Sequence, residues 1–365
     1  MPRRGVEKVA ETGKRDRRLT EIRDYILDHV SEHPHDIARL TAEEFGLSRQ
    51  SVIKHLRHLV SDGFITASGR TRARKYKLKT IVDHVFALEV TPDLAEDVEW
   101  RQKILPLMGG VNENVNDICH YGFTEMVNNV IDHSEAKEAA VAIKRTARSI
   151  ELRVFDKGIG IFQKLQSVFG LEDPRHVLLE LSKGKLTSDP DNHTGEGIFF
   201  ASRMFDEFAI SSGALYFKRF NKRDAEWLIE VKDVSPTKGT AISMMIHPKA
   251  EHTTKEIFAR FSDDEYRFSR THIPIELAVY EGEKLLSRSQ AKRILARSER
   301  FKEVLLDFRG VTEIGQAFAD EIFRVFRREH PEIDLVWMFT TPDIDQMIQR
   351  VTSPASAPAV PGPVE

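Results

Sequence analysis

Two pairs of glycines, Gly158 with Gly160 and Gly195 with Gly197, interrupt the middle of a 365-residue chain. The first pair follows Glu151–Asp156, which predicts a β-strand ending in Asp-x-Gly-x-Gly. The second pair precedes an apolar run that predicts a helix. Glycines allow the backbone to turn tightly against a flat ligand, and free N–H groups at a helix N-terminus bind phosphate. The pattern favours an α/β layer around such a ligand, although a strand-to-loop turn with an incidental Asp is an equal alternative for the first pair.

A third motif lies earlier, between Phe123 and His133. Glu125, Asn129 and His133 recur every four residues, so one face of a helix presents all three. A carboxylate can take a proton from water or a hydroxyl, and an amide oxygen is a hard ligand that suits Mg²⁺. Taken alone, this spacing is more typical of a solvated helix face.

Two further segments complete this region. The polar run from Ser182 to Asn192 contains Lys183 and Lys185 and is suited to a mobile lid over a ligand. The run from Lys238 to Ile246 predicts the last strand of the same sheet.

In this order the motifs resemble the N, G1 and G2 boxes of the GHKL ATPase superfamily, and the Glu-x3-Asn-x3-His form is most similar to its anti-sigma-factor serine kinases. The resemblance spans residues 85–250 and implies a Bergerat-type α/β sandwich that binds ATP and Mg²⁺. It implies Glu125 as the general base, Asn129 as the Mg²⁺ ligand and Asp156 as the partner of the adenine amino group. The other positions expected around the nucleotide are His133, Gly158, Gly160, Lys183, Lys185, Thr194, Gly195, Gly197 and Thr240, the last through its hydroxyl.

Two features depart from the kinases of that superfamily. The G2 phrase places Glu196 and Ile198 where kinases usually have leucines, which affects the expected geometry of the lid. The chain also shows no helical hairpin with a phosphoacceptor histidine, because His55 and His58 lie in a predicted DNA-reading helix and His120 begins a core helix. A sensor histidine kinase is therefore not expected.

The N-terminal 80 residues carry most of the positive charge. They hold 18 Lys and Arg against 11 Asp and Glu, a net of +7, whereas the rest of the chain has a net of −10. Three helices and a basic hairpin over residues 16–80 resemble the winged helix-turn-helix of bacterial and archaeal regulators, which implies binding to double-stranded DNA. The residues expected to contact DNA are Arg49, Gln50, Ser51, Lys54 and Arg57 on the third helix, and Arg70, Arg72, Arg74 and Lys75 on the wing. A solubilising basic tail and a protein-docking winged helix are the alternatives.

The third region alternates strands and helices again, over residues 255–352. Its run from Leu306 to Glu321 resembles the STAS-like domains of unknown function that accompany GHKL modules. STAS domains of anti-anti-sigma factors carry a phosphorylatable serine just after the equivalent of Ile314, but Gly315-Gln316-Ala317 offers no hydroxyl. Self-phosphorylation there is disfavoured, and Asp307 and Asp320 are expected to be ordinary strand-end and helix-surface carboxylates.

The expected fold class is therefore multidomain α/β (α+β): a winged helix, a Bergerat-type sandwich and a small STAS-like domain. Residues 1–15, which are basic, and 353–365, which are rich in proline, are expected to be disordered. No apolar run approaches 18 residues, no secretory signal is present, and Cys119 is the single cysteine. These features predict a cytoplasmic protein that does not enter a membrane.

Three functions fit these observations. The favoured one is an ATP- and DNA-binding regulator in which nucleotide binding and slow hydrolysis control domain arrangement or dimerisation. The second is an anti-sigma-type serine/threonine kinase that phosphorylates a separate partner, and the third is an ATP-binding module without turnover. A homodimer, and a protein partner for the STAS-like domain, are further expectations.

Overall fold

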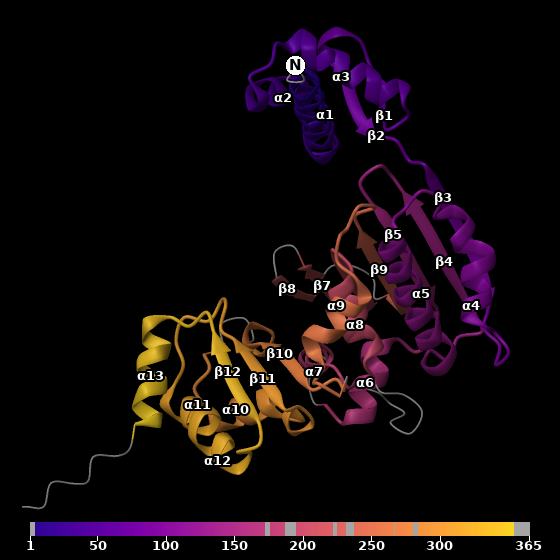
Figure 1. Ribbon diagram of the computed structural model, residues 1–365. Coiled ribbons are helices and arrows are strands. Elements are labelled where there is room, and N and C mark those ends of the chain that lie inside the picture. Colours follow the sequence, from indigo (N-terminus) through magenta and orange to yellow (C-terminus); the bar gives the residue numbers. More distant parts are fainter. Residues whose placement is uncertain are drawn as a thin grey trace, which may run out of the picture.

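The structure is a computed structural model that describes residues 4–171, 176–186, 195–221, 225–230, 237–265, 267–279 and 284–353, with the backbone alone at residues 4–16, 72, 225–230 and 237. Its helices and sheets form a mixed α+β architecture with three units in chain order (Figure 1). The proline-rich segment 354–365, expected to be disordered, lies outside the described residues.

The N-terminal unit contains three helices and a β-hairpin. Its third helix begins where the sequence predicts, because the Ser48 hydroxyl accepts a hydrogen bond from the Ser51 N–H and caps the first turn. Ile26, Leu56 and Leu59 are fully buried in a core that is separate from the rest of the molecule. The elements are α1 (Arg4–His29), α2 (Ile37–Phe45), α3 (Arg49–Ser61), β1 (Ile65–Ser68), the short 3₁₀ helix η1 (Thr71–Ala73) and β2 (Lys75–Leu78).

The start of the chain differs from the expectation. Residues 4–15, expected to lack structure, continue α1 from Arg4 to His29. Beyond Pro2 this stretch contains no proline, and its Lys, Arg, Glu and Ala residues are good helix formers that offset the unfavourable Gly5 and Gly13.

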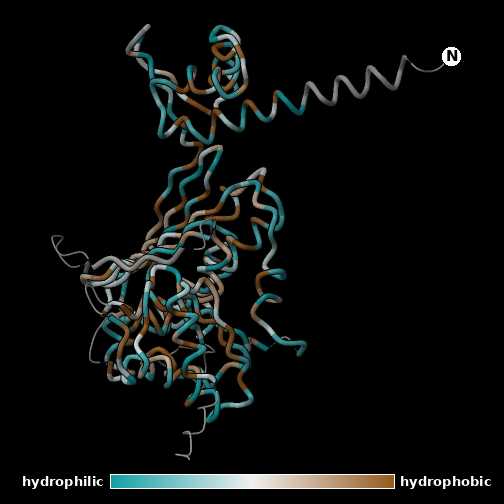
Figure 2. The backbone as a smooth tube through the Cα atoms, turned by 90° about the vertical axis from the view of Figure 1, so that its left-hand side faces the viewer, coloured by the Kyte–Doolittle hydropathy of each residue, from teal (hydrophilic) through white to brown (hydrophobic). Residues whose placement is uncertain are grey.

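The N-terminal unit stands at one end of the central sheet in both views (Figures 1 and 2). Arg148, in the turn between two central strands, reaches it by donating to Asp28 at 2.7 Å and to Asp24 at 3.2 Å. The Arg148 side chain is only 15% exposed, so these ion pairs are partly shielded and hold α1 against the turn.

The central unit is built on a seven-stranded sheet in the order β3-β4-β5-β9-β6-β7-β8, in which every neighbouring pair is antiparallel. The long helix α5 and the helix α8 pack against it. The elements are β3 (Val82–Glu89), α4 (Glu96–Glu99), the π-helix η2 (Trp100–Ile104), η3 (Leu105–Leu107), α5 (Glu113–His133), β4 (Glu138–Arg145), β5 (Ile150–Asp156), α6 (Ile161–Phe169), α7 (His176–Lys183), α8 (Gly197–Met204), β6 (Glu207–Gly213), β7 (Leu215–Phe220), β8 (Ala225–Glu230), β9 (Thr237–Ile246) and α9 (Thr254–Phe261).

The boundaries of this unit differ from those expected at residues 85 and 250. Strand β3 pairs with β4 from Val82 onward. Helix α9, expected in the third region, packs on the central unit because its Phe258 contacts Tyr121 of α5 and Phe200 of α8.

The third unit is a three-stranded parallel sheet in the order β10-β11-β12, with helices on the face that carries Val304 and Leu306. Its hydrophobic core is continuous with that of the central unit. The elements are β10 (Arg270–Pro274), η5 (Ile275–Ala278), α10 (Arg288–Leu295), η6 (Ser298–Arg300), β11 (Glu303–Asp307), α11 (Gln316–Asp320), the π-helix η7 (Glu321–Phe326), α12 (Arg327–Glu329), β12 (Asp334–Met338) and α13 (Pro342–Thr352).

Candidate functional site

A cavity of about 300 Å³ opens between α5, the ends of β5 and β9, and the start of α8. Segments far apart in the sequence meet here, including all three motifs that the sequence singles out. The polar lining residues are Glu125, Asn128, Asn129, Asp132, His133, Ser134, Asp156, Lys164, Glu196 and Thr240, and the apolar walls include Val154, Ile161, Leu165, Leu181, Leu186, Ile198 and Ile242.

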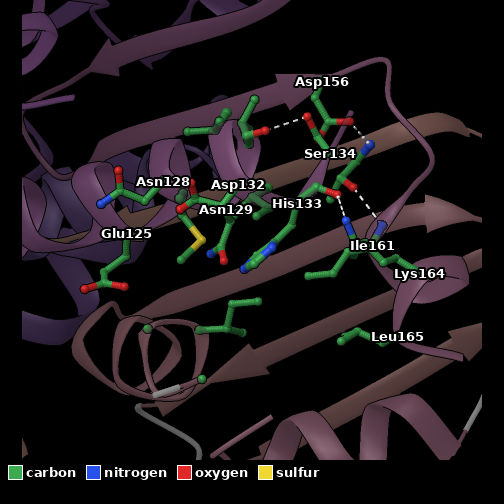
Figure 3. Close-up of a pocket in the computed structure, with 18 of the residues that line it drawn as sticks. Glu125, Asn128, Asn129, Asp132, His133, Ser134, Asp156, Ile161, Lys164 and Leu165 are labelled. Atoms are coloured by element: carbon green, nitrogen blue, oxygen red, sulfur yellow. Dashed lines mark hydrogen bonds between the residues drawn. The ribbon is translucent and has the colours of Figure 1, made fainter. Parts of the chain in front are cut away.

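One face of α5 forms the long side of the cavity. Glu125, Asn129 and His133 all line it and point to the same side of the helix (Figure 3). The opposite face buries Phe123 and Val127 in the core, which fixes the rotation of the helix. The predicted helix and the predicted shared face are therefore present.

The end of β5 forms the buried end of the cavity, where Asp156 and Thr240 are 7% and 6% exposed. The Asp156 carboxylate accepts the N–H of Gly158 at 2.8 Å and the N–H of Thr240 at 3.3 Å, both through Oδ1. The Thr240 hydroxyl in turn accepts the N–H of Ile161 at 3.0 Å. Burial raises the pKa of Asp156 above its usual value, although these hydrogen bonds oppose the shift. Neither Gly158 nor Gly160 is among the residues that line the cavity, and Gly160 is the N-cap of α6.

Gly158 and Gly239 allow the chain to pack tightly around Asp156. A Cβ at residue 158 would lie 1.8 Å from the Ser134 carbonyl oxygen, at the end of α5. A Cβ at residue 239 would lie 2.1 Å from the Asp156 carbonyl oxygen, and Gly239 also has φ +81°. These close backbone contacts join α5, β5 and β9, so the glycines are needed for the shape of the site.

We expect Gly158→Ala to destabilise the protein by about 1–3 kcal/mol, because the methyl group must displace backbone rather than a flexible side chain. Urea unfolding would measure the change. Gly109→Ala is the matched control, since a Cβ at residue 109 would meet no atom within 4 Å and the φ of Gly109 is not positive. Equal unfolding midpoints for the two variants would contradict the role given to Gly158.

The N-terminus of α8 faces the carboxylate of Glu125. A Cβ at Gly197, the first residue of α8, would lie 2.0 Å from Glu125 Oε2. Gly195 has φ +70°, and a Cβ there would lie 2.6 Å from the Leu186 backbone. The N-terminus of α8, which is positively polarised and carries no side chain at Gly197, therefore faces the Glu125 carboxylate at this end of the cavity.

The two lysines among the expected ligand-binding residues also lie outside the cavity lining. Lys183, only 1% exposed, donates to Glu180 and to the Ala296 carbonyl, and Lys185 donates to the Arg300 carbonyl. Neither lysine lines the cavity, so the structure does not bring them together with the other expected contacts. The reason is that Lys183 ends the buried helix α7 rather than lying in a polar lid. Thr194 and residues 187–192 of the expected lid lie outside the described residues.

Several lining residues were not predicted from the sequence. Lys164 donates to the His133 carbonyl at 2.8 Å and lines the cavity. Glu196 is half-buried, and burial raises its pKa while Lys185 opposes the shift. Tyr121 lies outside the lining but hydrogen-bonds the carboxylate of Glu125, one turn later, and burial together with Glu125 and Glu196 raises the pKa of the Tyr121 phenol. The i, i+4 spacing of Tyr121 and Glu125 was the available signal.

A second candidate surface lies on the N-terminal unit. The predicted contact residues Arg49, Gln50, Lys54 and Arg57 are exposed on α3, with Ser51 half-buried. Arg70 and Arg74 are exposed on the hairpin and Lys75 is half-buried, while the Arg72 side chain lies outside the described residues. Helix α3 and the hairpin of β1 and β2 therefore both carry exposed cationic side chains on the N-terminal unit.

The third unit matches its structural expectations. Asp307 is a strand-end carboxylate that is buried and bonded to His272 and Arg309. Although burial opposes its ionisation, these hydrogen bonds hold the pKa of Asp307 below its usual value. Asp320 pairs with Arg324 on the helix surface, as expected for an ordinary carboxylate.

Comparison with known proteins concerns this third unit. Residues 290–345 match the family described as STAS-like domain of unknown function (DUF4325), which confirms the expected STAS-like region. None of the curated proteins matches the chain. In the part of the chain that the structure describes, no helix is long and apolar enough to cross a bilayer.

Proposed function

We propose that the central unit is a GHKL-type ATP-binding domain of Bergerat fold, attached to a DNA-binding winged helix and a STAS-like domain. The observation that carries the proposal is the meeting of the three motifs around one cavity: Glu125 and Asn129 from α5, Asp156 from β5, and Gly197 at the start of α8. These are residues to which the resemblance in sequence assigns contacts with the nucleotide and its metal.

The buried end of the cavity, around Asp156, suits an adenine ring. Apolar side chains such as Val154, Leu165 and Ile242 form the walls, and Asp156 is the buried acceptor that an exocyclic amine requires. Backbone N–H groups hold Oδ1 of Asp156, which fixes the orientation of the carboxylate before a ligand binds.

The other end suits a polyphosphate with Mg²⁺. Protein sites commonly hold Mg²⁺ through one or two side-chain oxygens together with substrate phosphates and water. The Asn129 amide oxygen fits that role, and the N-terminus of α8 with Gly195 and Gly197 offers N–H groups to phosphate.

Glu125 is the proposed general base. In the proposed reaction its carboxylate accepts a proton from a water molecule, the water oxygen forms a bond to the γ-phosphorus, and the bond from that phosphorus to ADP breaks. We favour slow hydrolysis whose nucleotide state changes domain arrangement or subunit pairing, and through it DNA occupancy. Phosphotransfer to a serine or threonine of a separate partner would use the same carboxylate.

Incubation of purified full-length protein with γ-labelled ATP and Mg²⁺, with and without cell extract, tests the proposal. Release of free phosphate would support hydrolysis, and a labelled partner protein would instead support the kinase. Absence of both, together with no ATP binding by calorimetry, would refute the proposed function.

The N-terminal unit supplies the proposed DNA contact. Exposed Arg49, Lys54 and Arg57 on α3 are suited to base edges and phosphates, and the cationic hairpin is suited to the backbone.

We expect replacement of Arg72, Arg74 and Lys75 by Ala to weaken duplex binding and to flatten its dependence on salt. Removal of each phosphate contact should lower the slope of log K against log salt by about 0.9. Titration of a labelled duplex at several salt concentrations would measure this. The control removes three exposed cations elsewhere, Lys255, Arg328 and Arg350, and should keep the wild-type slope. Identical slopes in both variants would refute the role of the hairpin.

A further inference from the structure

One short segment connects the cavity to the third unit. We define it as the pocket-wall segment, residues 181–186. Leu181 and Leu186, at its two ends, both line the cavity. The Leu186 N–H donates to the Gly195 carbonyl at 3.3 Å, so the segment also holds the glycine turn before α8. Any displacement of the segment would therefore change the cavity wall and this turn together.

The third unit holds the middle of this segment through Lys183. The Lys183 ammonium donates to Glu180 at 2.7 Å and to the Ala296 carbonyl at 2.8 Å. Its own carbonyl accepts the Thr271 hydroxyl of β10 at 2.7 Å. Helix α7, which ends at Lys183, contacts β10 directly (Figure 1). A buried charge with such partners fixes geometry, because moving it would leave polar groups without compensation.

Lys185 adds a reciprocal pair of contacts at the rim. Its ammonium donates to the Arg300 carbonyl at 2.9 Å, and the Arg300 guanidinium donates to the Lys185 carbonyl at 3.1 Å. The ammonium also lies 4.7 Å from the centre of the Phe301 ring. The pocket-wall segment is thus held by backbone as well as side-chain groups of the third unit.

One residue on each side of this junction has a left-handed backbone conformation. Lys185 has φ +56° and Arg297 has φ +61°, and neither is a glycine. Left-handed conformations of such residues persist where surrounding contacts enforce them. Arg297 makes one of these contacts, an ion pair with Glu180 at 3.1 Å.

We infer that the STAS-like unit positions the wall of the nucleotide site, with Lys183, Lys185 and Arg300 as positioning residues that act from outside the cavity. The inference rests on the proposed ATP site. Because coupling between two sites is reciprocal, nucleotide binding should stabilise the junction around Ala296–Arg300, and a change at this junction should alter nucleotide affinity. The STAS-like unit thereby becomes part of the regulation of the nucleotide site.

The test uses full-length protein with Arg300→Ala or Lys185→Met, which remove rim contacts and leave the buried Lys183 pair in place. Hydrogen exchange without nucleotide should become faster in peptides that cover residues 176–186 and 195–204. ATP affinity measured by calorimetry should fall about fivefold or more, within the usual range of coupling. Lys302→Met is the matched control, since it removes an ion pair with Asp263 that lies near the same junction, and it should change neither quantity.

The two measurements separate this inference from the proposed function. If the wild-type protein binds no ATP, the proposed function fails, and exchange without nucleotide still tests the positioning. Unchanged exchange in both variants would overturn the inference. Faster exchange with wild-type ATP affinity would overturn it as well, because the junction would then be structural without acting on the site.

Discussion

Replacement of Glu125 by Ala should lower ATP turnover by roughly 10²–10⁴-fold while ATP affinity stays near that of the wild type. The substitution removes the proposed proton acceptor but leaves Asn129 and the N-terminus of α8 in place. Steady-state release of phosphate would measure turnover, and calorimetry would measure affinity. Glu125→Gln, which keeps the size of the side chain against Gly197, should show the same loss.

Asn129→Ala provides the contrast on the same helix face. It removes the proposed Mg²⁺ ligand, so the magnesium-dependent part of nucleotide binding should weaken. The two variants should therefore fail in different assays. A Glu125→Ala protein with wild-type turnover would exclude Glu125 as the general base and leave it as a structural carboxylate beside α8.

The local elements of the site could be predicted from the sequence because short-range signals specify them. The i, i+4, i+8 spacing of Glu125, Asn129 and His133 defines one face of a helix whatever surrounds it. Gly158 is required by the close approach of the Ser134 carbonyl, whereas the group that approaches Gly197 is the Glu125 carboxylate, at the end of a flexible side chain.

The arrangement of these elements could not be predicted in the same way. Strand β9 inserts between β5 and β6, and β3 joins the sheet three residues before the expected boundary. Strand order depends on pairings between distant segments, which alternation along one strand does not encode. The last strand in sequence is consequently an inner strand of the sheet.

Lys183 and Lys185 show a second limit of predicting the site from the sequence. In sequence they belong to a polar run before a glycine pair, where lysines that bind phosphate would be expected. In the structure their partners are Glu180, Ala296 and Arg300, and two of these lie more than 110 residues away along the chain. Only the packing of the third unit against α7 reveals that these cations hold the cavity wall.

Asp156→Asn should lower ATP affinity by about ten- to a hundredfold. The change replaces a charged acceptor with a weaker, partly donating group opposite the adenine amine, and hydrogen bonds to charged groups contribute about 1.5–3 kcal/mol. In the wild-type protein, Oδ1 of Asp156 accepts the N–H groups of Gly158 and Thr240. The fold should survive the substitution, because the amide oxygen of the new side chain can accept the same two N–H groups. Calorimetry with ATP and Mg²⁺ would measure the loss.

A matched substitution separates this effect from a general loss of carboxylate charge. Asp206 also accepts a backbone N–H, from His247 at 2.7 Å, in the same unit but outside the cavity lining. Asp206→Asn should therefore bind ATP like the wild type, while Asp156→Asn should not.

A comparison with GTP adds a second measurement, because guanine carries a carbonyl at the position of the adenine amine, and the amide introduced by Asp156→Asn could donate to it. The Asp156→Asn protein should consequently lose much of its preference for ATP over GTP. Equal ATP affinity in a folded Asp156→Asn protein would show that adenine does not bind at this end of the cavity.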